Sequence, residues 1–163
     1  MSTRPERFPM TQSRQAAGFT LLEMLIVLAI LSILGALAYP NYAGYIVRTK
    51  RTEGQFALIE TMQAQERYRM RHNGYLAFAA DAMPDEDAGE FRWWSGAAAA
   101  SSHYELDAHA CPGMEIADCV EVRARPGTVR VDARFRDPDC GALTLDSQGR
   151  QGAQAANGAR CWP

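Results

Sequence analysis

The chain opens with eighteen mainly polar residues and then changes to an almost unbroken apolar run. Residues 19–38 of that run read FTLLEMLIVLAILSILGALA. A helix of this length rises about 30 Å, which is the thickness of the hydrocarbon core of a bilayer. The run therefore predicts a helix that spans a membrane.

One charged residue, Glu23, lies near the start of the apolar run. A carboxylate in lipid costs about 3 kcal/mol or more without a partner, and intramembrane carboxylates are functional by default. A secretory signal peptide has a shorter apolar region with a small-residue cleavage site behind it. Here Gly18 precedes the run and no such site follows it. Two alternatives remain: a plain single-pass anchor, which leaves Glu23 unexplained, and a buried helix of a soluble protein, for which twenty residues this apolar would be unusual.

Helix-compatible sequence continues beyond the apolar run to about Arg71. Pro40 lacks a backbone donor and predicts a kink. Further on, apolar residues gather on one arc of a helical wheel, although polar residues share the arc. These apolar residues are Phe56, Leu58, Ile59, Met62 and Met70. We expect this arc to pack under a sheet, and Asn73-Gly74 to end the helix.

The C-terminal part alternates apolar and polar residues with the period of two that is typical of strands on a core. Four antiparallel strands are predicted, at residues 103–110, 120–125, 129–136 and 142–146. Pro126-Gly127 predicts a hairpin between the second and the third. That hairpin would place Arg123 opposite Arg130, a like-charge pair that diagonal acids compensate. One apolar face per strand suits a sheet on a single helix, so the fold class is α+β.

Two adjacent tryptophans, Trp93 and Trp94, stand in the irregular connection between the helix and the strands. We expect these indoles to pack on the edge of the core, since two adjacent aromatic residues in a loop more often pack than recognise a partner. Exposure of one indole for contact with a partner or a neighbouring subunit is the alternative.

Charge argues against nucleic acid as a partner. The chain has 17 basic and 19 acidic residues, and removing residues 1–18 leaves 14 and 18. The predicted outward face of the hairpin is rich in arginine, and DNA binding is the alternative interpretation of that face. Its arginines are Arg123, Arg125, Arg130, Arg134 and Arg136. Interleaved acids, the acidic balance and the lack of a nucleic-acid motif favour a solvated face instead.

Four cysteines, Cys111, Cys119, Cys140 and Cys161, all lie in the C-terminal third. An even number outside the membrane segment predicts two disulfides and an oxidising compartment, with three connectivities open. A metal site from these thiols with His103 and His109 is disfavoured, because the spacing matches no standard zinc pattern. Basic residues flank both ends of the apolar run, so the positive-inside rule does not decide orientation. No catalytic motif is found, and we expect neither an enzyme nor a cofactor.

The start of the apolar run, Gly18-Phe19-Thr20-Leu21-Leu22-Glu23, resembles the processing signature of the type IV pilins. The resemblance implies that prepilin peptidase cuts between Gly18 and Phe19 and methylates the new amine of Phe19. It also implies that Glu23 directs assembly by meeting that amine on another subunit. The alternative is that Glu23 lies at the headgroup level of the membrane or pairs with the amine of its own chain. The leader is long for the family, and a start at Met10 would give nine residues.

Two further segments resemble minor pilins of the PilE type. They are Tyr39-Pro40-Asn41-Tyr42 with the polar run to Tyr68, and Cys140-Gly141-Ala142 with Cys161-Trp162. The second implies a disulfide between Cys140 and Cys161, which leaves Cys111 and Cys119 as a local pair.

The resemblance implies a pilin fold, a long kinked N-terminal helix whose C-terminal half packs on a four-stranded antiparallel sheet. Its parts would be a cleaved leader (1–18), a transmembrane and filament-core helix (19–39), a periplasmic half-helix (40–72), a connecting loop (73–101) and a sheet with the disulfides (102–163). The implied protein enters the inner membrane with its N-terminus in the cytoplasm and leaves it for an extracellular pilus.

The implied partners are other pilin subunits, prepilin peptidase and the inner-membrane assembly platform. The implied function is that of a minor subunit of a pilus, serving adhesion, twitching motility or DNA uptake. A pseudopilin of type II secretion and a membrane-tethered adhesin or DNA-uptake module are the alternatives.

Overall fold

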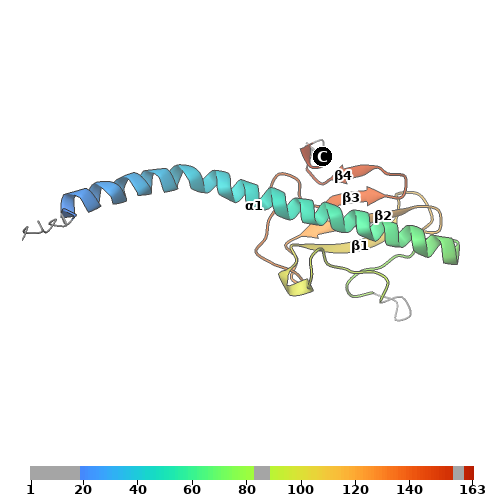
Figure 1. Cartoon of the computed structure of the whole chain (residues 1–163). Helices are drawn as coiled ribbons and strands as arrows, with labels where there is room; N and C mark the ends of the chain where they lie inside the picture. Colours follow the sequence, from blue (N-terminus) through green and yellow to red (C-terminus); the bar gives the residue numbers. More distant parts are fainter. Residues whose placement is uncertain (1–18, 83–88, 156–159) are drawn as a thin grey trace, which may run out of the picture. The chain divides into compact units, whose positions relative to one another are not determined.

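The computed structural model describes residues 19–82, 89–155 and 160–163 (Figure 1). It contains one long helix, α1 (Leu21–His72), a short 3-10 turn, η1 (Ala99–Ser101), and four strands. The strands are β1 (Tyr104–Ala110), β2 (Val120–Pro126), β3 (Leu143–Asp146) and β4 (Gln151–Ala153). The chain divides into two compact units, one ending at Asn41 and one running from Tyr42 to Pro163. The predicted leader lies outside the described residues.

Local hydrogen bonds define both ends of α1. At the start, the Thr20 hydroxyl accepts a hydrogen bond from the Glu23 backbone N–H at 3.2 Å. Thr-x-x-Glu is the spacing of a capping box, in which this bond satisfies one of the unpaired donors of the first turn. At the end, Asn73 has φ 57° and its N–H donates to Arg69 O at 2.8 Å. The left-handed residue stops the helix at the predicted place.

The apolar stretch of α1 is long enough to cross a membrane. Its large apolar side chains from Leu21 to Leu37 are all at least 44% exposed. The helix is continuous through Pro40, and the kink stays a prediction.

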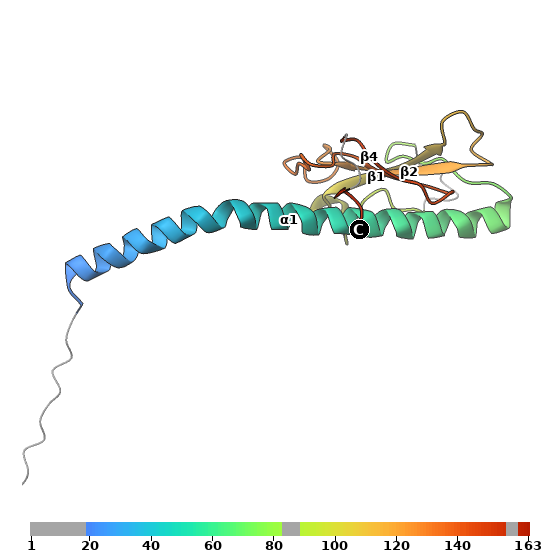
Figure 2. The same cartoon turned by 90° about the horizontal axis from the view of Figure 1, so that it is seen from above.

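The four strands form one antiparallel sheet in the order β1-β2-β3-β4. Figure 2 shows the sheet lying over the C-terminal half of α1. Leu106 pairs with Ala124, which pairs in turn with Leu143, so apolar side chains run in a row across the sheet. All three side chains are fully buried and belong to the hydrophobic core that the sheet shares with Leu58 of α1. The α+β class and the antiparallel sheet are therefore confirmed.

The predicted strand at residues 129–136 is wrong, and so is its hairpin with β2. Gly127 has φ +62°, and a Cβ there would lie 2.0 Å from the Phe135 carbonyl oxygen. The chain turns away at this glycine, and the Asp132 N–H donates to Ser102 O at 2.9 Å instead of to β2. Val129 is consequently 91% exposed. β3 takes the place beside β2, and the three-residue β4 makes the fourth strand.

The helix face that packs on the sheet agrees only in part with the predicted arc, since Leu58 is fully buried and Met62 packs against the core. Phe56, Ile59 and Met70 are 63, 40 and 79% exposed, whereas Gln55 and Gln65 are buried. The Gln55 amide donates to Cys161 O at 2.6 Å. Gln65 donates to the carbonyl of Leu76 at 2.7 Å and accepts from its N–H at 3.0 Å. Because their amides find backbone partners, these polar residues can occupy the buried face.

The connecting region covers the outer edge of β1. Phe78 and Ala108 exchange two backbone hydrogen bonds, and Leu106 N–H donates to Trp93 O at 2.8 Å. A covered edge cannot pair with another chain. Trp93 and Trp94 meet edge to face at 5.1 Å and are both half-buried, and Trp93 packs against the core, so the favoured packing role is confirmed.

Candidate functional site

Glu23 occupies the third position of α1, on the surface of the apolar stretch. It is exposed and has no ion-pair partner among the residues that the structure describes. Phe19 is 79% exposed and lies just ahead of the Thr20 cap, one helical turn before Glu23. Gly18, the other predicted cleavage residue, lies outside the described residues. The start of α1 therefore presents an uncompensated carboxylate on a surface that otherwise suits lipid or another helix.

A buried ion pair joins α1 to the sheet and to the loop before β3. Arg51 contacts Asp137 through two bonds, Nε to Oδ2 at 2.8 Å and Nη2 to Oδ1 at 2.6 Å. The Tyr104 hydroxyl donates to Asp137 Oδ2 at 2.7 Å, and Asp139 Oδ2 lies 3.2 Å from Arg51. We call these four residues the Arg51 cluster. The Asp137 side chain is 0% exposed.

Burial and the hydrogen bonds within the Arg51 cluster determine the charge of its members. Hydrogen bonding to Asp137 raises the pKa of Arg51, and burial raises the pKa of the Tyr104 hydroxyl. Burial alone would raise the pKa of Asp137, but the hydrogen bonds from Arg51 and Tyr104 outweigh it and lower the pKa. Asp137 is therefore a carboxylate bound to a guanidinium, and the cluster holds the head to the helix rather than transferring protons. Sequence reasoning missed it, because Arg51 and Asp137 carry no spacing signal.

The arginines of β2 face acids on β1, and the predicted pairing of Arg123 with Arg130 does not occur. Arg123 pairs in register with Asp107, and Arg125 with Glu105. Their Nη2 atoms lie 2.9 and 2.8 Å from the partner carboxylates. Glu105 and Asp107 are only 1% and 5% exposed. Opposite charges across the strands thus neutralise part of the arginine-rich face.

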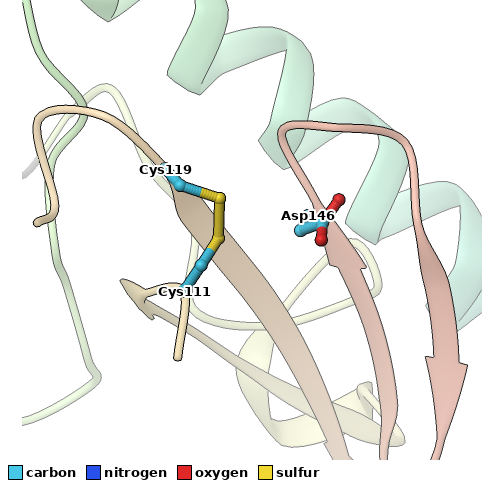
Figure 3. A group of neighbouring side chains, drawn as sticks. All are labelled: Cys111, Cys119 and Asp146. Carbon is cyan, nitrogen blue, oxygen red and sulfur yellow. A yellow bond between two sulfur atoms is a disulfide. The ribbon is translucent and has the colours of Figure 1, made fainter. Parts of the chain in front are cut away.

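Both disulfides join the pairs predicted from the sequence. Cys111–Cys119 spans eight residues and Cys140–Cys161 spans 21. Figure 3 shows Asp146 beside the first of them. Both sulfurs are used in the disulfide, and Asp146 Oδ1 accepts from the N–H groups of Gln148 and Arg150 at 3.0 and 2.9 Å. This group closes a turn and leaves no thiolate for a metal.

The histidines of the disfavoured metal site also have other neighbours. His109 Nε2 lies 3.1 Å from Glu121, and His103 stacks edge to face on Phe135 at 5.1 Å. His103 Nδ1 is 3.8 Å from Glu53. The two rings therefore belong to the packing of the sheet ends.

Comparison with known proteins gives two family matches. Residues 40–144 match the family described as "Type IV minor pilin ComP, DNA uptake sequence receptor". Residues 13–39 match the "Prokaryotic N-terminal methylation motif", which covers Gly18, Phe19 and Glu23.

Two curated relatives are similar over the N-terminal part. The type IV major pilin PilA of Myxococcus xanthus is 39% identical over 62 residues, 38% of this chain and 28% of the relative. The type IV wide pilus major component PilA4 of Thermus thermophilus is 40% identical over 64 residues, 39% of this chain and 49% of the relative. The chain spans less than half the length of either relative.

Proposed function

The chain belongs to the type IV minor pilin family, and we propose from that premise that it is a subunit of a type IV pilus. Prepilin peptidase would remove residues 1–18 and methylate Phe19. The subunit would wait in the inner membrane with its N-terminus on the cytoplasmic side. The assembly platform would then move it into an extracellular filament with other pilin subunits.

Glu23 is the observation that carries this proposal. Its carboxylate has no cation near it among the described residues, and the surface around it is apolar. Cleavage at Gly18 would create a cation on Phe19 of every subunit. Pairing Glu23 of one subunit with that amine on another removes a stranded charge, and losing one partner of such a buried pair costs about 3–5 kcal/mol. The pair thus favours both association and one axial register.

Substitution of Glu23 tests the proposal. Glu23→Ala should remove the chain from filaments while leaving its amount in the membrane unchanged. Glu60→Ala is the matched control, since Glu60 lies on the same helix and only pairs with Arg92 at the surface. The readout is immunogold labelling of sheared filaments. Filaments that carry the Glu23→Ala chain at the normal level would refute the role of this carboxylate.

Mass spectrometry of the native protein tests processing independently. The proposal requires a mature chain that begins at Phe19 and carries one added methyl group. A chain that retains residues 1–18 would contradict it, because no amine would then exist for Glu23 to meet. Release of labelled filaments into the medium separates a pilus subunit from a type II secretion pseudopilin.

A role as DNA-uptake receptor is the second candidate, favoured by the wording of the matched family. The charge balance argued against nucleic acid, and Glu105 and Asp107 neutralise Arg123 and Arg125. Arg134, in the segment that leaves the sheet after Gly127, has its side chain 98% exposed and, among the described residues, meets only Asp132, at 4.0 Å.

Gel-shift titration of the full chain with duplex oligonucleotides at two salt concentrations tests this candidate. A receptor should prefer one sequence over its scrambled version by about 1,000-fold or more. Equal, weak binding to both would reject the candidate.

A further inference from the structure

A groove of about 890 Å³ lies between α1 and the C-terminal residues, wholly within the unit that begins at Tyr42. We call it the Arg48 groove. Its polar and aromatic lining comes from Arg48, Thr52 and Gln55 on α1 and from Asp139, Arg160 and Trp162 opposite. It is separate from the start of α1, where Glu23 lies.

Two guanidinium groups in this groove are uncommitted. Arg51, which also lines it, is bound to Asp137 and Asp139. Arg48 and Arg160 are exposed, and neither side chain has an ion-pair or hydrogen-bond partner among the described residues. Asp137 and Asp139 are both bound to Arg51, so neither carboxylate is paired with Arg48 or Arg160. An anionic group can therefore enter without displacing an existing pair.

The place of Arg48 in the chain indicates which anion it meets. Arg48 follows Ala38, the end of the apolar run, by only ten residues along the chain. Arginine side chains near the end of a membrane segment extend toward the headgroup layer. Tyr39, Tyr42 and Tyr45 lie between, 74, 64 and 67% exposed. Exposed tyrosines are typical of the membrane interface.

We propose that the Arg48 groove binds the phosphate of an anionic phospholipid headgroup while the subunit is in the membrane. This inference rests on the proposed function, because it needs residues 19–38 to be a membrane anchor. A guanidinium matches phosphate oxygens with two parallel hydrogen bonds. A phosphatidylglycerol headgroup keeps its negative charge, whereas the choline of phosphatidylcholine cancels it. Each arginine near an anionic surface strengthens binding about fivefold, so Arg48 and Arg160 together give about 25-fold.

Native mass spectrometry of the full chain in a neutral detergent measures this preference. The chain is titrated with phosphatidylglycerol or phosphatidylcholine of identical acyl chains, and bound lipids are counted. The wild type should prefer phosphatidylglycerol by about 25-fold, and Arg48→Gln with Arg160→Gln should abolish the preference. Arg134→Gln, which removes an exposed arginine outside the groove, should leave it unchanged. Arg48→Lys with Arg160→Lys should keep most of it, which excludes misfolding as the cause.

Equal affinity of the wild type for the two lipids would overturn the inference, and so would an unchanged preference in the double glutamine variant. Inorganic phosphate and a duplex oligonucleotide are added as competitors. If either displaces phosphatidylglycerol at a similar concentration, the groove is a general anion site and the lipid assignment fails. The filament test of Glu23→Ala is independent, so normal filaments without lipid preference would reject only this inference.

Discussion

Replacing Asp137 by asparagine tests how the head is held on α1. The change keeps the size of the side chain but removes the charge that faces Arg51 at 2.6 and 2.8 Å. Removing one partner of a buried pair costs about 3–5 kcal/mol, because the other charge stays buried. Asp139 remains 3.2 Å from Arg51 and is 71% exposed, so water and this second acid soften the loss. We therefore expect Asp137→Asn to cost about 3 kcal/mol, at the lower end of that range.

Urea and thermal unfolding of residues 42–163, with both disulfides intact, measure this cost. For a unit of this size, about 3 kcal/mol corresponds to a fall in Tm of roughly 12 °C. Glu60→Gln is the control, because the Glu60–Arg92 pair is exposed on both sides and should contribute less than about 1 kcal/mol. In a double-mutant cycle, Arg51→Met and Asp137→Asn should couple by more than about 1 kcal/mol. Additive losses, or a loss no larger than the control, would refute the argument that the cluster fastens the helix.

Further outcomes follow from the turns, the disulfide and the acids. Gly127→Ala should lower the free energy of unfolding in urea by about 2 kcal/mol or more, because its φ is +62° and the added Cβ meets a carbonyl oxygen at 2.0 Å. Gly89→Ala is the control and should be neutral, since a Cβ there has nothing within 4 Å. Cys140→Ser with Cys161→Ser should cost about 3 kcal/mol, measured the same way, since a loop of 21 residues is opened; no change would contradict the chain-entropy argument. Burial alone would raise the pKa of Asp146, but hydrogen bonds from the Arg150 backbone and side chain and from Gln148 outweigh it and lower the pKa. The Asp146 carboxylate therefore stabilises the folded chain fully above about pH 5, and this contribution disappears as the pH falls through the lowered folded-state pKa. The stability difference between the wild type and Asp146→Asn should therefore shrink below about pH 4, and a difference that is constant from pH 7 to pH 2 would show that the charge contributes nothing.

Periodic patterns predicted most of the elements. The alternation from Tyr104 to Ala110 and from Val120 onward predicts strands with one apolar face, and β1, β2 and β3 follow it. The same alternation at residues 129–136 misled, because a tertiary contact competes with the sheet there. Thr128 and Arg130 bind the buried Glu105, and this holds the segment at the end of β1.

The helix face was predicted only in part, with Leu58 and Met62 in the core, for a related reason. Hydrophobicity ranks Phe56 and Met70 above Gln55 and Gln65, but burial depends on whether an amide finds a partner. Those partners, Cys161 O and the backbone of Leu76, are supplied by other parts of the chain. The Arg51 cluster has the same property, since Asp137 lies 86 residues away from Arg51. The short β4 carries too few residues for any period to show.

The cap at Thr20 has an electrostatic consequence for the end of the chain. The aligned peptide dipoles of α1 place about half a positive charge at its N-terminus. Any amine created on Phe19 would stand against that positive pole and would repel it. The Thr20 hydroxyl relieves one donor of the pole but supplies no negative charge. Glu23 of the same chain lies in the first turn and offsets part of that pole. A carboxylate arriving from a neighbouring molecule would neutralise the amine together with the part of the pole that remains.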